Sequence, residues 1–150
     1  MAGAAVVLCV VAVAAALVSQ HRFGMLPCPW CVLQRVIFLA IALAALPALL
    51  RSLPVRRVSA SLMLTGALAG VAAALWQHFV AAGSSSCNLT LADRINDSLG
   101  LADRWPEVFA AYATCADAAV NLLGLPYEFW SLGLFVVLAA IAAGLIRQPG

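Results

Sequence analysis

Long uncharged apolar stretches alternate with short polar segments along this chain. The apolar stretches predict four membrane spans, at about residues 2–19, 32–50, 58–79 and 129–146. As a helix, the 18 residues of the first stretch are about 27 Å long. That length approaches the roughly 30 Å of a bilayer's hydrocarbon core. The pattern therefore predicts an all-α integral membrane protein, a bundle of four transmembrane helices.

The first apolar stretch has one alternative interpretation, a cleaved signal peptide with Ala14, Ala15 and Ala16 as a small-residue cleavage site. No Lys or Arg precedes the stretch, although a signal peptide begins with positive charge. We therefore interpret it as the first span. Cys9 lies inside it, and we expect it to be a small buried packing residue.

Two polar segments separate spans one and two, and spans three and four. The first is a short hairpin over residues 20–30, and the second is a loop over residues 80–128. In the second loop Leu91, Ile95 and Leu99 recur every four residues, with polar side chains between them. This spacing predicts a short amphipathic helix lying in the membrane interface. Between spans two and three, Pro47 is expected to kink or end the second helix early.

Charge predicts the orientation of the spans. Arg51, Arg56 and Arg57 are expected in one short loop with Pro54, and all six acidic residues fall within residues 91–128. Short arginine-rich loops stay in the cytoplasm. Four spans then place both termini in the cytoplasm. Both cysteine-bearing loops are predicted to be extracytoplasmic, in the periplasm or its equivalent. That compartment is oxidising, so disulfide chemistry is favoured over metal binding.

Composition agrees with a membrane protein. Apolar residues make up 65% of the 150 positions and charged residues 9%, against about 25% charged in soluble domains. We expect one membrane domain over residues 1–150 that has the lipid bilayer as a partner. The net charge is only +2, and the basic residues do not form a run along the chain. Nucleic acid is therefore not an expected partner.

Cys28 and Cys31 are separated by two residues, just before the second span. This spacing suits a reversible disulfide or half of a metal site. Cys31 is expected near the N-terminus of a helix, with Arg35 one turn onward on the same face. The helix end and the guanidinium both favour a reactive thiolate at Cys31. The alternative is a static disulfide in a tight turn.

Cys87 and Cys115 lie 28 positions apart in the second loop. A disulfide between them could be a structural staple that stabilises the fold by roughly 3–4 kcal/mol. It could instead be a redox pair, with Cys87 exposed by the flexible residues 83–86. A four-cysteine zinc site is a third possibility, but the 28-residue separation is poor for zinc, and we predict no metal.

Several motifs in order resemble the disulfide bond formation protein B (DsbB) family. Residues 27–35, PCPWCVLQR, resemble its first-loop motif. Residues 104–109, RWPEVF, followed by Cys115, resemble its second-loop motif. Residues 123–125, LGL, and 130–135, WSLGLF, resemble its entry into the last span. The resemblance covers nearly the whole chain.

The resemblance implies a four-helix inner-membrane enzyme that reoxidises a periplasmic thioredoxin-fold partner, a DsbA-like protein. Electrons would pass to a membrane quinone, ubiquinone or menaquinone. Cys87 would form the mixed disulfide with the partner, Cys115 would be its mate in the second loop, and Cys28 would exchange with Cys115. Cys31 would be the thiolate next to the quinone.

Two further positions are implied to bind the quinone. Arg35 would hold it and support the charge on Cys31. His78 resembles a position near the family's quinone pocket, although the stretch from His78 to Cys87 is shorter than is usual in the family. The alternative for His78 is an interfacial histidine without a ligand.

Two alternatives to this function stay open. A quinone reductase resembling vitamin K epoxide reductase also combines several spans with a Cys-x-x-Cys motif and a loop pair. In that family the motif follows the loop pair, whereas here it comes first. The other alternative is a non-catalytic membrane protein with inert disulfides or a zinc site.

Overall fold

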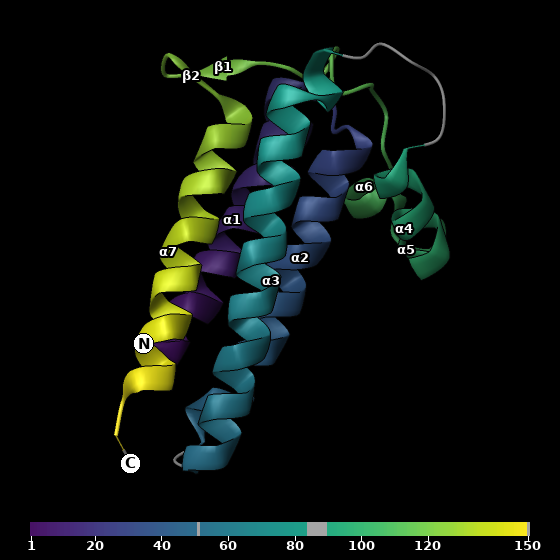
Figure 1. The fold of residues 1–150 in the computed structure, drawn as a ribbon. Coiled ribbons are helices and arrows are strands. Elements are labelled where there is room, and N and C mark those ends of the chain that lie inside the picture. The colour runs from purple at the N-terminus through teal and green to yellow at the C-terminus, as the bar shows by residue number, and fades with distance from the viewer. Residues whose placement is uncertain (51, 84–89, 150) are drawn as a thin grey trace.

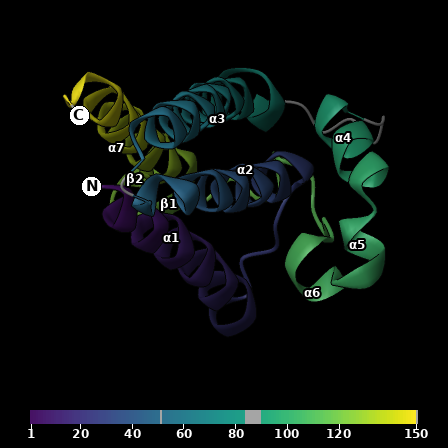
Figure 2. The ribbon, with the colours of Figure 1, turned by 90° about the horizontal axis from the view of Figure 1, so that it is seen from below.

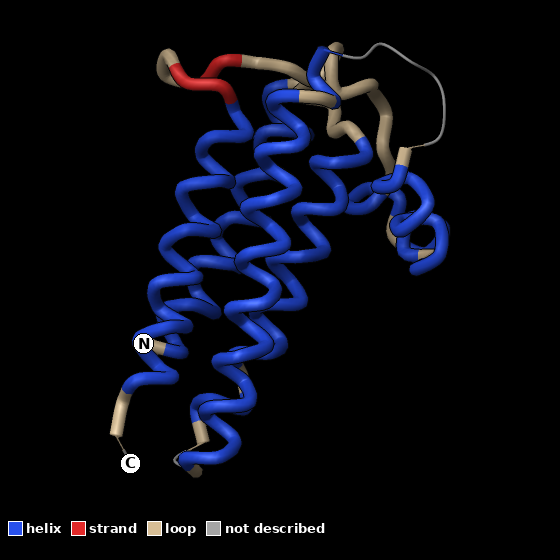
Figure 3. The backbone as a smooth tube through the Cα atoms, in the orientation of Figure 1, coloured by secondary structure: helices blue, strands red, loops and turns tan. Residues whose placement is uncertain are grey.

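Four long helices form an elongated bundle in the computed structural model, which describes residues 1–50, 52–83 and 90–149 (Figures 1 and 3). All four are long and apolar enough to cross a membrane, which confirms the predicted four-helix membrane fold. They are α1 (Ala2–Phe23), α2 (Pro29–Ala45), α3 (Leu53–Phe79) and α7 (Tyr127–Arg147).

Short elements connect the long helices. The turns η1 (Pro47–Leu49) and η2 (Ala81–Gly83) follow α2 and α3. The second loop carries three short helices, α4 (Leu91–Leu99), α5 (Leu101–Arg104) and α6 (Pro106–Phe109). A two-stranded antiparallel hairpin, β1 (Asn121–Leu122) and β2 (Leu125–Pro126), leads into α7.

Helix ends differ from the sequence prediction at the first hairpin. α1 continues four residues beyond Ser19 to Phe23, where Gly24 adopts a left-handed conformation with φ 64° and caps the helix. α2 begins at Pro29, because a proline suits the first helical position, where no backbone N–H is needed. The polar hairpin is thus much shorter than residues 20–30.

The second helix ends at Ala45, before Pro47, as predicted. The arginine-rich segment was expected to be a loop, and this was wrong for its second half. Pro54 lies in the first turn of α3, so Arg56 and Arg57 belong to that helix. Arg56 Nη2 donates to the carbonyl oxygens of Gln148 and Pro149, both at 3.0 Å, which joins this end of α3 to the C-terminus.

Small residues let the helices approach closely in the bundle core. α7 packs against α3, and Phe135 of α7 stacks on Phe38 of α2 with ring centroids 4.1 Å apart. Gly70 of α3 lies against the Phe135 ring, so that a Cβ there would overlap with it. Cys9 is fully buried in this core, which confirms its predicted packing role.

Gly70→Ala is expected to lower the free energy of unfolding by about 1–3 kcal/mol, because the added methyl group must displace the buried Phe135 ring. Thermal unfolding in detergent measures the change. Gly133→Ala in α7 is the matched control, since a Cβ there has nothing within 4 Å. An equal loss of stability in both variants would contradict the close packing inferred here.

α4 confirms the short helix expected in the second loop. Thr90 and Asp93 form a capping box at its start, and Gly100 ends it in a left-handed conformation. Leu91 and Leu99 are exposed, while Asn96 is buried and donates from Nδ2 to the Pro29 carbonyl oxygen at 3.0 Å. The short helices α4, α5 and α6 lie outside the four-helix bundle, and α4 and α6 contact α2 (Figure 2).

Candidate functional site

Cys28 and Cys31 share the first turn of α2. Cys28 is the N-cap, with an extended backbone of the kind that a following proline favours. Its Sγ accepts a hydrogen bond from the Cys31 backbone N–H at 3.3 Å. This geometry brings the Cys28 and Cys31 sulfurs to 2.9 Å from each other, where either can donate a hydrogen bond.

Cys115, far along the chain, reaches the same place. Its Sγ donates to Cys28 Sγ at 2.7 Å. The segment before it is fastened by the N–H groups of Tyr112 and Ala113, which donate to the Pro27 carbonyl oxygen at 3.0 and 3.3 Å. Cys28 is therefore in contact with two sulfurs at once, one beside it in sequence and one from the second loop. The three sulfurs are thiols here, since a disulfide bond is about 2.05 Å long.

Cys28 is the most enclosed of the three sulfurs. It is 0% exposed, in a small apolar cluster that includes Trp30, Leu33 and Ala92. Hydrogen bonds with Cys115 and Cys31, followed by burial, raise the pKa of the Cys28 thiol above its ordinary value. In the fully reduced state Cys28 therefore keeps its proton and is not an attacking thiolate.

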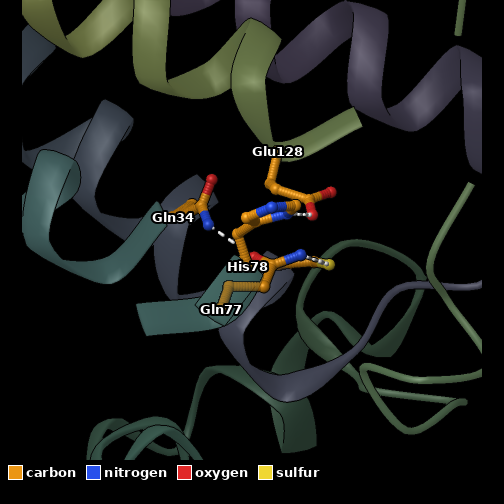
Figure 4. A network of polar contacts seen from close by, with 5 residues as sticks. Gln34, Gln77, His78 and Glu128 are labelled. Atoms are coloured by element: carbon orange, nitrogen blue, oxygen red, sulfur yellow. Dashed lines mark hydrogen bonds and ion pairs between the residues drawn. The ribbon is translucent and has the colours of Figure 1, made fainter. Parts of the chain in front are cut away.

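Cys31 faces polar groups from α2 and α3. Gln77 donates from Nε2 to Cys31 Sγ at 3.4 Å, and Gln34 donates from its Nε2 to Gln77 Oε1 at 2.6 Å. Figure 4 shows the two glutamine side chains meeting between the helices. Gln34 thereby orients the Gln77 amide so that an N–H, not an oxygen, faces the sulfur. Gln77 was missed by sequence reasoning, although a polar residue inside an apolar helix is a signal of a functional site.

Arg35 is buried, at 5% exposure, one turn beyond Cys31. Its Nη1 donates to Gln20 Oε1 and to the Val108 carbonyl oxygen, both at 2.8 Å. The sequence predicted a ligand-binding arginine and gave no sign of this second contact. Arg35 thus also links α1 and α2 to the second loop just after α6 begins. Both bonds use Nη1, so further N–H groups of the five on a guanidinium remain to donate.

His78 lies in the last turn of α3 and forms a contact that the sequence did not predict. Its Nδ1 lies 2.6 Å from Oε1 of Glu128, at the start of α7 (Figure 4). The His78 side chain is 29% exposed, whereas that of Glu128 is 5% exposed. His78 is thus not an isolated interfacial residue. An acid at the mouth of an apolar span was the available signal for Glu128.

A cavity of about 260 Å³ lies beside Cys31, between α1, α2, α3 and α7. Its walls toward the bundle centre are apolar and include Phe38 and Leu134. Its polar lining includes Gln34, Arg35, Gln77, Tyr127 and Glu128, together with Ser19 and Ser131. The cavity thus combines an apolar body with polar groups next to one sulfur, which suits an amphipathic ring with oxygen substituents.

Cys87, expected to be the sulfur that meets the partner, lies outside the described residues. Within the described parts of the chain no group of acids, histidines and cysteines is arranged to hold a metal ion. The Cys28 sulfur is 2.9 and 2.7 Å from its two neighbours. Thiolates around one zinc ion would be about 3.8 Å apart, given Zn–S bonds of about 2.3 Å in a tetrahedron.

Comparison with known proteins gives one consistent family. The family model described as disulfide bond formation protein DsbB matches residues 1–145. A disulfide bond formation protein B of Herminiimonas arsenicoxydans is 34% identical over 127 residues, 84% of this chain and 80% of the relative. Those of Aromatoleum aromaticum and Nitrosomonas europaea are 36% and 31% identical, covering 86% and 94% of this chain and 80% and 88% of the relatives.

These relatives and the family match span both the cysteine-bearing turn of α2 and the second loop. The family match agrees with four helices long and apolar enough to span a membrane, and this chain gathers three cysteines at one end of the bundle. The chain therefore belongs to the disulfide bond formation protein B family and is a membrane thiol–disulfide oxidoreductase with a quinone-linked role.

Proposed function

We propose that Cys115, Cys28 and Cys31 pass electrons in that order from a periplasmic DsbA-like protein toward a membrane quinone. The single observation that carries this is the position of Cys28, which touches both other sulfurs. Exchange of a disulfide requires a thiolate to attack one sulfur and displace the other. Cys28 is the sulfur that can bond alternately to either neighbour with little movement.

The chemical step follows from that geometry. When Cys28 and Cys31 are joined by a disulfide, the Cys115 thiolate attacks Cys28. The Cys28–Cys115 bond forms, the Cys28–Cys31 bond breaks, and Cys31 leaves as a thiolate that carries the electron pair. Cys115 becomes a free thiolate when the DsbA-like partner attacks its proposed mate Cys87. That attack leaves the partner and Cys87 joined by a mixed disulfide. The partner's second thiolate then attacks the partner sulfur of this bond, Cys87 leaves as a thiolate, and the partner's two thiols end as a disulfide.

Three features of the chain stabilise negative charge on Cys31. The sulfur sits in the first turn of α2, at the positive end of the helix dipole. Gln77 donates an N–H to it, and the Arg35 guanidinium lies one turn away. In the described structure the Gln77 donor faces Cys31, whereas the Cys115 sulfur bonds to Cys28. The arrangement therefore favours release of Cys31 as the leaving thiolate.

The cavity beside Cys31 fits a quinone ring. Apolar walls suit the ring, and the N–H donors of Arg35 and Gln34 suit its oxygens. A bound quinone supplies a two-electron acceptor. Its high potential is needed because DsbA-type partners are themselves strong oxidants, near −120 mV. The choice between ubiquinone and menaquinone belongs to the same proposal, and the cavity chemistry is compatible with either.

We also propose that the cysteine end of the bundle faces the periplasm of a bacterial inner membrane. Arg56, Arg57 and Arg147 lie at the opposite end, near both termini (Figure 1). Positive residues in short segments stay in the cytoplasm. The cysteines then meet the oxidising compartment, in which disulfides persist.

Oxidation of a reduced DsbA-like protein tests the proposed function. The full chain in quinone-depleted membranes is mixed with the reduced partner, with and without added ubiquinone or menaquinone. We expect catalytic oxidation only when a quinone is present. A reduced partner that stays reduced with either quinone would overturn the proposal and favour inert disulfides. Zinc bound by the purified protein would favour the metal alternative.

Cys115→Ser is expected to accumulate a covalent complex between the chain and the partner. The variant has no Cys87–Cys115 disulfide, so the partner is added in its oxidised form. The Cys87 thiolate then attacks the partner's disulfide, and one partner sulfur leaves as a thiolate. The mixed disulfide persists because the chain no longer has Cys115 to attack Cys87 and release the partner. Non-reducing electrophoresis after acid quenching measures the adduct, which we expect to rise at least about 10-fold over the wild type. The double variant Cys87→Ser/Cys115→Ser is the control and should give no adduct. An adduct of equal size in that control would count against Cys87 as the partner's target.

A further inference from the structure

Glu128 lies in the cavity wall, where reduction of a quinone would require a proton donor. It lines the cavity beside Cys31 and is 5% exposed. Among the described residues that line the cavity it is the only carboxyl group, and its Oε1 is 2.6 Å from Nδ1 of His78. The relay through Cys115, Cys28 and Cys31 uses neither residue.

His78 connects this buried carboxyl group to the surface. Its ring lies between Phe79 and Phe129, with centroid distances of 4.9 and 4.5 Å, and its side chain is 29% exposed. One nitrogen of the ring meets Glu128, and the ring itself reaches the edge of the bundle. An imidazole can accept a proton at one nitrogen and release one from the other. The pair therefore joins the cavity to the surface of the bundle at the cysteine end.

The reaction needs protons inside the cavity. Oxidation of two thiols to a disulfide releases two electrons and two protons, and reduction of a quinone to a quinol takes up the same number. Cys31, however, leaves the exchange as a thiolate and brings no proton with it. The protons lost by the partner's thiols enter the periplasmic water, so a group in the cavity wall must return protons from water to the quinone oxygens.

The other titratable groups that face the cavity are less suited to this task. α2 contributes Cys31, which carries the electrons, and Arg35, whose guanidinium cannot be deprotonated in proteins. α7 contributes Tyr127 beside Glu128, and α3 contributes His78 behind it. The described cavity residues from α1 and from the loop before α7 are uncharged, for example Ser19 and Val120.

We propose that Glu128 and His78 form the proton path of this enzyme. Glu128 donates a proton from its carboxyl group to a quinone oxygen in the cavity, and His78 Nδ1 returns a proton to Glu128 from water. This inference rests on the proposed quinone site. It adds the residues that supply the protons of the reaction. In this proposal Glu128 is a catalytic residue, and His78 acts through Glu128.

Glu128→Gln tests the path, because glutamine keeps the shape and can still bond to His78 but has no acidic proton. We expect reduction of a short-chain ubiquinone to slow by about 100-fold, the lower range of general acid catalysis. The loss should grow as the pH rises and protons become scarcer. Glu128→Asp should restore most of the rate, and a small carboxylic acid such as acetic acid should partly rescue Glu128→Ala. Asp103→Asn, which changes an exposed acid on α5, is the matched control.

Two further measurements separate this proposal from the proposed function. Quinone-free protein is mixed with reduced partner, and thiol alkylation follows formation of the Cys28–Cys115 disulfide, which should be unchanged in Glu128→Gln. Equilibrium binding of the short-chain ubiquinone should also change by less than about threefold. Absence of exchange in the wild type would defeat the proposed function itself.

Three results would overturn the proton path. One is a Glu128→Gln rate within about threefold of the wild type, and another is loss of binding that accounts for the slower rate. The third is an equal loss in Tyr127→Phe, which would assign the proton to the phenol. If Glu128→Gln fails to fold, the His78→Gln variant tests the proton path in its place, because that variant keeps the Glu128 carboxyl group. It should slow the reaction and be rescued by imidazole, and an unaltered rate would reject the path.

Discussion

Cys31→Ser is expected to reduce quinone-linked turnover to background, a loss on the order of 10³-fold or more. A serine hydroxyl does not ionise at neutral pH and cannot form the disulfide with Cys28. The Cys115 thiolate then has no Cys28–Cys31 disulfide to attack. The variant should instead accumulate a Cys28–Cys115 disulfide by exchange: Cys28 attacks Cys115 of the proposed Cys87–Cys115 disulfide, and Cys87 leaves as a thiolate. The exchange is favoured because the Cys28 and Cys115 sulfurs are already 2.7 Å apart. Quinone absorbance and mass spectrometry of the non-reduced protein measure the two effects.

Cys9→Ala is the matched control for that experiment. Cys9 is fully buried in the core formed by the long helices, away from the three-sulfur group. It should therefore retain turnover, with any loss confined to stability. Full quinone reduction by Cys31→Ser would remove Cys31 from the relay. Failure of Cys28 and Cys115 to pair in the variant would contradict their contact.

Arg35→Ala is expected to raise the KM for quinone by roughly 30-fold, if one hydrogen bond from a charged donor contributes about 2 kcal/mol. The same change removes the bonds from Nη1 to Gln20 and to the Val108 carbonyl oxygen. Part of the effect should therefore appear as a looser second loop and slower exchange at Cys115. Steady-state kinetics at varied quinone and at varied partner concentration separate the two contributions.

Gln20→Ala and Arg35→Lys complete this test. Gln20→Ala removes one acceptor of Arg35 and leaves the guanidinium in place. It should affect the loop contact more than the KM for quinone. Arg35→Lys keeps the charge but not the fork of donors, and an intermediate KM is expected. An unchanged KM in Arg35→Ala would show that Arg35 is a structural link only.

The local sequence pattern was enough to predict the membrane spans and the pair of cysteines in the first turn of α2. Apolar runs of membrane-spanning length fix where helices form, because backbone polar groups in lipid must be satisfied within the helix. The sequence PCPW places a proline at the first helical position, so Cys28 becomes the N-cap and Cys31 follows within one turn. The predicted ends were several residues off at α1 and α2. α1 continues through Gln20, which is buried and accepts from Arg35, to Phe23, and α2 begins at Pro29.

The resemblance of motifs allowed the pairing of Cys28 with Cys115 to be expected, but spacing alone did not. Four cysteines allow three pairings, and nothing in the local sequence chooses among them. The choice depends on how the second loop returns to the bundle. In the structure the Pro27 carbonyl oxygen receives two N–H groups from the segment before Cys115, and Asn96 fastens α4 to the Pro29 carbonyl oxygen.

The sequence by itself determined that this chain crosses a membrane four times and carries a dithiol turn at a helix start. Both follow from interactions between residues close along the chain. Only the tertiary structure decided that Cys28 touches Cys115, that Arg35 holds the Val108 carbonyl oxygen, and that His78 meets Glu128. Those contacts join residues 50 or more positions apart, and they form only when the packed helices bring buried polar groups to the partners they need.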